Sequence, residues 1–245
     1  MASDVRIENG PVGPVLHPPG EDDTVILYVP GNQDAGTGPE PRLDTAVRLA
    51  ELTGSTVVCC RYRSRFPDAL HDVRAGYRYC GRWDSVAVAG ERMGAGLAAA
   101  LLVQLRDSGA ELPGCAVLVS ALLDLTMQAR SLRLHVSGDS PVKITELRQR
   151  VADYAGGAML TDPYPSPLYA NLHGLAPVQL LVGGADPLLD DSLAFAARAA
   201  RSGVLVDLRV WPDATSLDAA AATAMADFIV ANRVESTRSS RLMAG

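Results

Sequence analysis

The chain has 245 residues, a formal net charge of −6 and 48% hydrophobic residues, which is enough for the core of one α/β domain. No Lys/Arg cluster with interleaved aromatic residues occurs, so a nucleic-acid partner is not expected. The first 30 residues lack the apolar core of a signal peptide, and the longest apolar run, Leu97 to Val103, is too short for a membrane span. We therefore expect a cytoplasmic protein without a membrane partner.

Apolar runs typical of buried strands alternate with helical patterns along the chain. In order, we expect an N-terminal antiparallel ribbon (Val5–Ile7 and Val15–His17), strand Thr24–Val29, helix Arg42–Thr53, strand Thr56–Arg61, helix Pro67–Tyr79, strand Val86–Ala89, helix Gly94–Asp107, strand Ala116–Ser120, strand Val178–Val182, helix Asp191–Ser202, strand Val206–Trp211 and helix Ser216–Asn232. This alternation predicts one α/β domain over residues 1–245, with a mostly parallel sheet and helices on both faces.

The alternation stops between Ala121 and Pro177, a stretch with five prolines and a helical pattern near Ile144–Tyr154. We expect this stretch, residues 121–177, to be a cap-like insertion over the carboxyl ends of the strands, where ligands bind in such sheets. The polar tail, residues 235–245, is expected to be frayed. The four cysteines fit no zinc-site spacing and are expected to be buried free thiols.

The most informative segment joins the strand at Val86–Ala89 to an Ala- and Leu-rich helix through Gly90-Glu91-Arg92-Met93-Gly94. This is the outline of the G-x-S-x-G nucleophile elbow, with Arg92 where the serine stands. A guanidinium is a permanent cation that carries no nucleophilic atom. The segment therefore predicts the fold of a serine hydrolase without its covalent chemistry.

The chain resembles the bacterial hormone-sensitive-lipase family of α/β hydrolases over about residues 20–235. The resemblance is carried by the elbow and by five segments that stand in family order: TVILYVPGNQDAG, CCRYRSRFPDALHDVRAGYRY, VLVSALLDLT, DPYPSPLYANLHGLAPVQLLVGGADPLLDDS and LRVWPDATS. It implies the α/β-hydrolase fold. Family members also carry a helical N-terminal cap, which the resemblance implies to be truncated here, because Thr24 already begins the first central strand.

The chain departs from the family pattern at the catalytic positions. Arg92 replaces the serine, Ser216 falls at the position of the histidine, and Asp186 alone matches the triad. In the oxyanion loop the family's histidine is Pro30, and Gly31-Asn32-Gln33 follow it. The resemblance therefore implies a degenerate member that lacks both the nucleophile and the base of the usual mechanism.

Nine residues are candidates for the site. We expect Arg92, Asp186 and Glu91 to act in catalysis, and Asn32, Gln33, Asp34, Met93, Ser216 and His135 to contact a ligand. Arg92 has three alternatives: an idle side chain in solvent, an ion pair with Asp186, or a contact with a carboxylate, enolate or phosphate of the ligand. Structural alternatives are packing for Glu91, loop solvation for residues 32–34, and a helix cap for Ser216.

Three functions fit these residues. We expect a non-hydrolytic enzyme of small-molecule biosynthesis, one that cyclises, eliminates or isomerises a small apolar metabolite. The alternatives are a non-catalytic receptor or pseudoenzyme partner, and an esterase with relocated catalytic residues. No cofactor or metal is implied by the motifs present. The resemblance also implies a homodimer through Val206–Trp211 and Ser216–Asn232.

Overall fold

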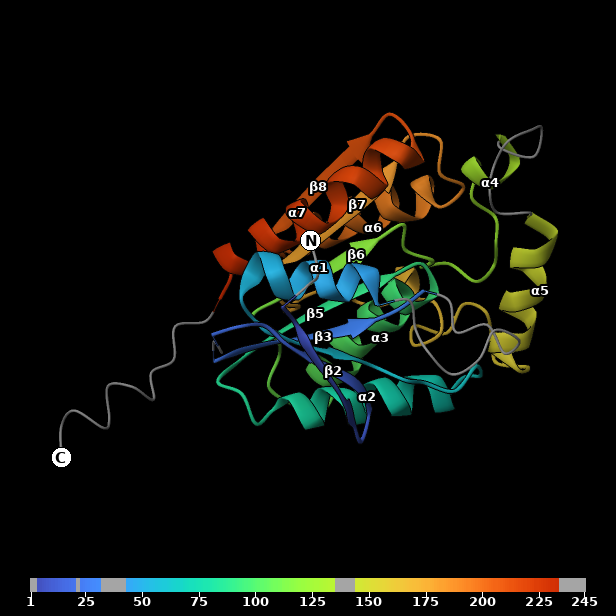
Figure 1. Ribbon diagram of the computed structural model, residues 1–245. Coiled ribbons are helices and arrows are strands. Elements are labelled where there is room, and N and C mark those ends of the chain that lie inside the picture. Colours follow the sequence, from blue (N-terminus) through green and yellow to red (C-terminus); the bar gives the residue numbers. More distant parts are fainter. Residues whose placement is uncertain (1–3, 21–22, 32–42, 135–143, 234–245) are drawn as a thin grey trace.

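The computed structural model describes residues 4–20, 23–31, 43–134 and 144–233, and its centre is an eight-stranded sheet (Figure 1). The strand order is β1-β2-β4-β3-β5-β6-β7-β8, antiparallel for β1–β2 and β2–β4 and parallel from β4 onward. The strands are β1 (Arg6–Gly10), β2 (Gly13–His17), β3 (Thr24–Val29), β4 (Thr56–Cys59), β5 (Ser85–Glu91), β6 (Cys115–Val119), β7 (Val178–Gly183) and β8 (Val206–Trp211). The predicted mostly parallel α/β sheet is confirmed.

Helices cover both faces of this sheet. Two of them, α1 (Asp44–Thr53) and α7 (Ala214–Ala231), lie side by side on one face, the near face in Figure 1. The other face is covered by α2 (Asp68–Cys80), α3 (Met93–Asp107) and α6 (Leu189–Arg201). The predicted helices are thus present, with ends that differ by at most two residues within the described ranges.

The central strands are buried on both faces and divide the core by alternation. In β3, Val25, Leu27 and Val29 belong to the cluster under α2, α3 and α6, whereas Ile26 and Tyr28 belong to the cluster under α1 and α7. This is the period of two that a strand imposes on its side chains. Because both faces of the sheet are covered, all six residues of β3 are buried, and all of them except Thr24 are hydrophobic.

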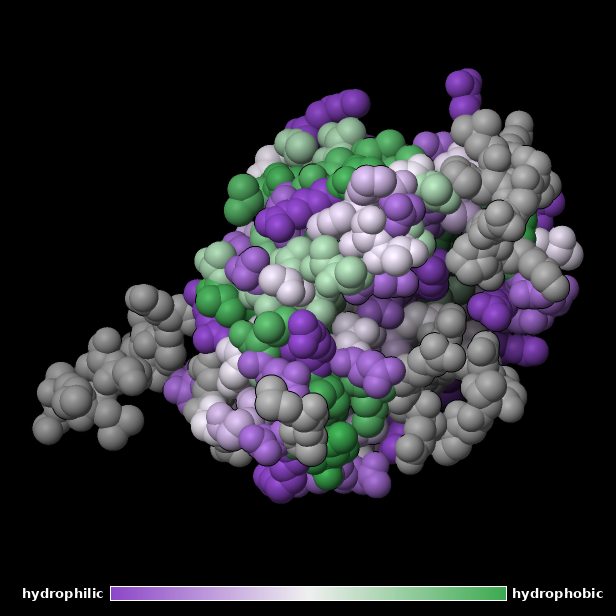
Figure 2. All heavy atoms as spheres, turned by 45° about the horizontal axis from the view of Figure 1, so that its top comes forward, coloured by the Kyte–Doolittle hydropathy of each residue, from purple (hydrophilic) through white to green (hydrophobic). Residues whose placement is uncertain are grey.

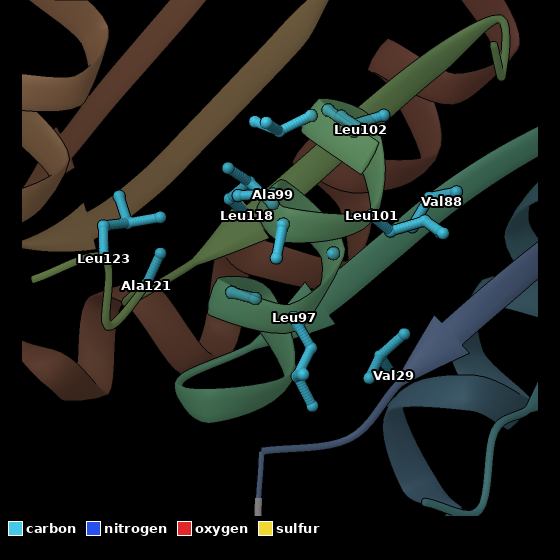
Figure 3. Packing of buried hydrophobic residues seen from close by; sticks show 14 of the residues in the cluster. Val29, Val88, Leu97, Ala99, Leu101, Leu102, Leu118, Ala121 and Leu123 are labelled. Carbon is cyan, nitrogen blue, oxygen red and sulfur yellow. The ribbon is translucent and has the colours of Figure 1, made fainter. Parts of the chain in front are cut away.

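Helix α3 is buried on nearly all sides and carries the elbow at its start. Figure 3 shows Leu97, Leu101 and Leu102 of α3 packed among side chains of β3, β5 and β6. A helix surrounded in this way needs small residues where neighbouring backbone comes close. A Cβ on Gly96 would lie 2.3 Å from the carbonyl oxygen of Leu122, so glycine is required there.

The insertion contributes α4 (Ser131–Leu134), α5 (Ile144–Ala155) and the 3₁₀ helix η1 (Pro167–Tyr169). The carboxyl end of α5 is anchored on the body of the domain. The amide of Phe66 donates to the carbonyl oxygen of Tyr154 (2.8 Å), and the two aromatic rings meet edge to face with centroids 6.3 Å apart. In Figure 1, α5 lies at one end of the sheet, apart from the main helical layers.

Within the described ranges, α7 is the helix whose length and composition would allow a membrane span, yet a third of it is buried and it packs on α1 and on β6 to β8. The four cysteine side chains are buried, as predicted, and form no disulfide among the described residues; burial raises the pKa of each thiol above its ordinary value. The predicted frayed tail, residues 235–245, lies outside the described residues.

Candidate active site

The connection between β5 and α3 has the geometry of a nucleophile elbow. Strand β5 ends at Glu91, α3 begins at Met93, and Arg92 between them has φ 50° and ψ −114°. A side chain in this region of φ/ψ space costs about 1–3 kcal/mol in strain, which is tolerated where the surroundings fix the backbone. The Arg92 amide donates to the carbonyl oxygen of Val119 (2.9 Å), and its own carbonyl accepts from Gly96 and Leu122 (both 3.1 Å).

The flanking glycines are required by close backbone contacts. A Cβ on Gly94 would lie 2.2 Å from the carbonyl oxygen of Val29, and one on Gly90 would lie 2.6 Å from that of Gly94. A Cβ on Gly31, two residues after the end of β3, would lie 2.7 Å from the carbonyl oxygen of Glu91. Three chain segments therefore meet at Arg92, and none of these glycines has room for a side chain. This close packing of backbone fixes the position of the Arg92 Cα atom.

Asp186 lies beyond the end of β7 and is 8% exposed. Its carboxylate accepts a hydrogen bond from Ser120 Oγ (2.7 Å) and one from the amide of Leu188 (2.8 Å). Ser120 follows β6 with φ 45°, so a second strained residue stands at the neighbouring strand end. The sequence analysis missed Ser120. A polar residue directly after the buried strand β6, which pairs with β7, could have indicated it as a site residue.

Two cavities meet at Arg92 and Asp186, which line both of them. The smaller, of about 50 Å³, is lined by Gly31, Arg92, Met93, Leu122, Leu147, Arg150, Asp186, Pro187 and Leu188. The larger, of about 210 Å³, is lined by Thr45, Glu91, Arg92, Val119, Ser120, Asp186, Ala214, Leu217, Asp218, Ala221 and Ala222. The insertion contributes to the smaller cavity, whereas α1 and α7 contribute to the larger one.

These linings bring together four of the predicted site residues. Met93 faces the smaller cavity and Glu91 the larger, beside Arg92 and Asp186. Burial and the neighbouring Glu91 carboxylate raise the pKa of the Tyr28 phenol under this site. No group of His, Cys, Asp or Glu suited to a metal ion occurs among the described residues.

Two of the structural alternatives for the site are not observed. Among the described residues no ion pair joins Arg92 to Asp186, because the carboxylate is held by Ser120 and Leu188 instead. Ser216 is also not the cap of the last helix: Asp213 takes that position and accepts from the Ser216 amide (2.8 Å). Ser216 stands in the first turn of α7 and lines neither cavity.

The remaining predicted contacts, Asn32, Gln33, Asp34 and His135, lie outside the described residues. The described site therefore consists of two adjoining cavities at the carboxyl edge of the sheet, with a cation at the elbow tip and a hydrogen-bonded carboxylate at the end of β7. A parallel sheet with an elbow after β5 and an acid after β7 defines the α/β-hydrolase class.

Comparison with known proteins gives the family. Residues 36–215 match the model of a family described by the alpha/beta hydrolase fold, and the chain belongs to this family. An acetyl-hydrolase of Streptomyces hygroscopicus is 32% identical over 81% of this chain and 69% of its own length. An esterase of Acinetobacter venetianus is 32% identical over 59% of this chain and 48% of its own length.

Solved structures agree with the sequence comparisons. An esterase from the bacterial hormone-sensitive lipase (HSL) family superposes with a TM-score of 0.86 at 30% identity, covering 95% of this chain and 86% of the other. A hormone-sensitive lipase from a metagenome library superposes with a TM-score of 0.85 at 28% identity, covering 94% and 87%. The predicted α/β-hydrolase fold is confirmed.

The expected function is overturned by the same comparisons. We predicted a non-hydrolytic enzyme for cyclisation, elimination or isomerisation, because Arg92 occupies the place of the nucleophile. The relatives are named acetyl-hydrolase and esterase, and the neighbouring structures are esterases, which favours a hydrolytic enzyme. The prediction weighed one side chain above the similarity of the whole chain to ester hydrolases.

Proposed function

We propose that this protein hydrolyses small acyl esters by direct attack of water, with Arg92 and Asp186 as its catalytic residues. The observation that carries the proposal is a retained elbow whose apex side chain and triad-position carboxylate line the same cavities. Arg92 and Ser216 at the other two triad positions make this a degenerate member of its family, so a serine acyl-enzyme is not formed at the elbow.

In the proposed reaction, Asp186 acts as the general base and Arg92 stabilises the negative charge of the intermediate. The Asp186 carboxylate takes a proton from a water molecule as the water oxygen attacks the ester carbonyl carbon. The electron pair of the C=O bond moves to its oxygen, where the Arg92 guanidinium stabilises the negative charge. When the intermediate collapses, the alcohol leaves with the proton held on Asp186, and the carboxylic acid product remains.

The start of α3 supports the same step. Met93 is the residue after the apex, and the amide at this position supplies an oxyanion donor in α/β hydrolases. The first amides of a helix have no partner within the helix and carry a partial positive charge. The carbonyl oxygen of an ester seated between Arg92 and Met93 is therefore met by a cation and by backbone dipoles from one side.

The experiment compares hydrolysis of phenyl acetate by the wild-type chain, Arg92→Gln and Asp186→Asn. We expect each substitution to lower kcat/KM by about 10²-fold or more, the usual cost of removing an oxyanion donor or a general base. Asn keeps one oxygen that accepts from the Leu188 amide, and its NH2 group can donate to Ser120 Oγ instead of accepting from it, so we expect the fold to be preserved. Arg148→Gln, on the exposed surface of α5, is the control and leaves the rate unchanged.

A second candidate is a receptor that binds esters without turnover. It is favoured by the surroundings of Asp186, whose hydrogen-bond donors among the described residues are Ser120 and Leu188 and not an imidazole. Binding of phenyl acetate by the wild-type chain, with hydrolysis no faster than in buffer, would support the receptor and sink the hydrolase.

A further inference from the structure

The two cavities that meet at Arg92 and Asp186 differ in size and in chemistry. The smaller, of about 50 Å³, is lined mainly by Met93, Pro187 and three leucines. The larger, of about 210 Å³, also carries the carboxylates of Glu91 and Asp218 and the hydroxyl groups of Thr45 and Ser120. An ester whose carbonyl group lies where the cavities meet therefore has one arm in a mainly apolar space and the other arm in a polar one.

The larger cavity owes its room to one face of α7. The residues of this helix that line it recur at intervals of three and four: Ala214, Leu217, Asp218, Ala221 and Ala222. This spacing places them along one side of the helix. Three of them are alanines, so the space between α7 and the start of α1 is not filled by long side chains. Ala214 and Asp218 are exposed, so the cavity opens to solvent beside the start of α7.

The orientation of a bound ester follows from the position of Met93. This residue lines the smaller cavity and not the larger one, and its amide is the oxyanion donor of the proposed reaction. The carbonyl group and the acyl chain attached to it therefore lie on the side of the smaller cavity, whose volume limits the chain to a few carbon atoms. The alcohol part of the ester points into the larger cavity and leaves through its open side.

The polar groups of the larger cavity match an alcohol that carries hydroxyl groups. The carboxylates of Glu91 and Asp218 accept hydrogen bonds and cannot donate them, whereas the Arg92 guanidinium donates and cannot accept. A hydroxyl group can accept from Arg92 and donate to a carboxylate at the same time. An ammonium group can only donate, and the nearby guanidinium repels it.

We propose that the substrate is a short acyl ester of an alcohol with further hydroxyl groups, and that Asp218 binds these hydroxyl groups in the larger cavity. The proposal rests on the hydrolase function above and names its substrate class. Asp218 is thus a specificity-determining residue outside the former triad, and the alanines of α7 set the size of the alcohol.

The first experiment compares 2,3-dihydroxypropyl acetate with 2-methylbutyl acetate, in which methyl groups replace the two hydroxyl groups. We expect kcat/KM to favour the dihydroxypropyl ester by about tenfold, because a hydrogen bond to a charged group adds a modest amount of free energy. Asp218→Ala removes this preference. Asp227→Ala, exposed on the same helix and absent from the cavity lining, retains it. A higher kcat/KM for acetylcholine than for the dihydroxypropyl ester would assign the cavity to a cation and overturn the proposal.

The second experiment tests which arm of the ester the larger cavity holds. Ala222→Leu places a bulky side chain in this cavity, and we expect it to lower kcat/KM for the dihydroxypropyl ester by about tenfold or more. Methyl acetate, whose alcohol part is a single carbon, should be hydrolysed as before. Ala219→Leu, at an exposed position of α7 that does not line the cavity, is the matched control. An equal loss for both esters in Ala222→Leu would contradict the assignment of the alcohol to this cavity.

Binding is measured separately, by ligand-observed NMR with two unreactive ethers, 3-ethoxypropane-1,2-diol and ethyl 2-methylbutyl ether. Tighter binding of the diol that disappears in Asp218→Ala supports the hydroxyl site even if neither ester is hydrolysed, an outcome that would sink the hydrolase proposal alone. Equal binding of the two ethers, or a preference for the diol that survives in Asp218→Ala, overturns the hydroxyl site, whatever the rate of hydrolysis.

Discussion

Arg92 has a strained backbone conformation that its surroundings hold in place. The apex conformation, φ 50° and ψ −114°, is held by backbone hydrogen bonds to Val119, Gly96 and Leu122. None of these bonds involves the Arg92 side chain, so the apex residue can change while the turn remains. The elbow conformation therefore depends on the backbone around the apex and not on the identity of the apex side chain.

The glycines of the elbow are therefore the residues on which its stability depends. We expect Gly94→Ala to destabilise the fold by about 3 kcal/mol or more, because its Cβ would lie 2.2 Å from the carbonyl oxygen of Val29. Urea denaturation measures the change. Gly109→Ala is the matched control: Gly109 has φ 64° but open space around its Cβ, so we expect about 1 kcal/mol. Equal losses in the two variants would contradict this account.

The sequence predicted some of the site residues and missed others, for a physical reason. Arg92 and Asp186 were found because the elbow and the segment before the acid are continuous stretches of chain. Ser120 was missed because its partner is 66 positions away, and the neighbouring positions of β6 and β7 that unite them are set by the sheet. Asp213, the cap of α7, was missed because Ser216 is also of a residue type that favours the cap position.

At the scale of elements, the insertion is tied to the sheet domain by a buried carboxylate. Asp191 on α6 is 2% exposed and accepts hydrogen bonds from the amides of Leu123 (2.9 Å) and Asp124 (3.0 Å). Burial raises the pKa of this carboxyl group to about 7, against the effect of the two amides that lower it. The first residues of the insertion thus depend on a group that titrates near neutrality.

This arrangement predicts a pH dependence of stability. Because the folded-state pKa is raised above the unfolded value, the folded chain binds the proton more tightly, and the free energy of unfolding falls as pH rises from about 4 to about 7. Asp191→Asn keeps an acceptor for both amides and cannot ionise, so we expect its stability to fall less over this range. Thermal melts between pH 5 and pH 8 measure the difference.

The control for this prediction is Asp227→Asn, on the exposed side of α7, which should follow the wild-type pH profile. A wild-type stability that rises from pH 5 to pH 7 in step with Asp191→Asn would rule out the buried carboxyl group as the cause.

The helices themselves were predictable from the periodicity of the sequence, but the burial of Asp191 was not. Its sequence neighbour Asp190 is the same residue type and is only partly buried.

At the scale of the whole molecule, β8 is the last strand of the sheet, and among the described residues no further strand pairs with its outer edge. Leu205, Leu208 and Val210 are exposed at or beside this strand, with Leu205 63% and Val210 49% exposed. Figure 2, which turns this end of the molecule forward, shows hydrophobic surface among hydrophilic residues. We propose that the chain forms a homodimer through β8 and α7, because exposed apolar edge strands favour pairing.

Light scattering after size-exclusion chromatography tests the dimer. Val210→Glu places a charge on the proposed interface and should shift the wild-type dimer to a monomer. Ile7→Glu, at an equally exposed apolar position on β1 at the opposite edge, should leave the dimer intact. A wild-type monomer at micromolar concentration, or a dimer lost in Ile7→Glu alone, would contradict the proposed interface.

The central claim is that ester hydrolysis proceeds here without an acylated side chain, and intact-protein mass spectrometry tests it most directly. The chain is mixed with excess phenyl acetate, quenched during turnover and weighed, with Asp186→Asn as the control for non-specific acetylation. We predict release of acetate with no added acetyl mass on the wild-type chain relative to the control. An acetyl group that accumulates on one cleft residue, such as Ser120, and turns over with product would contradict the account.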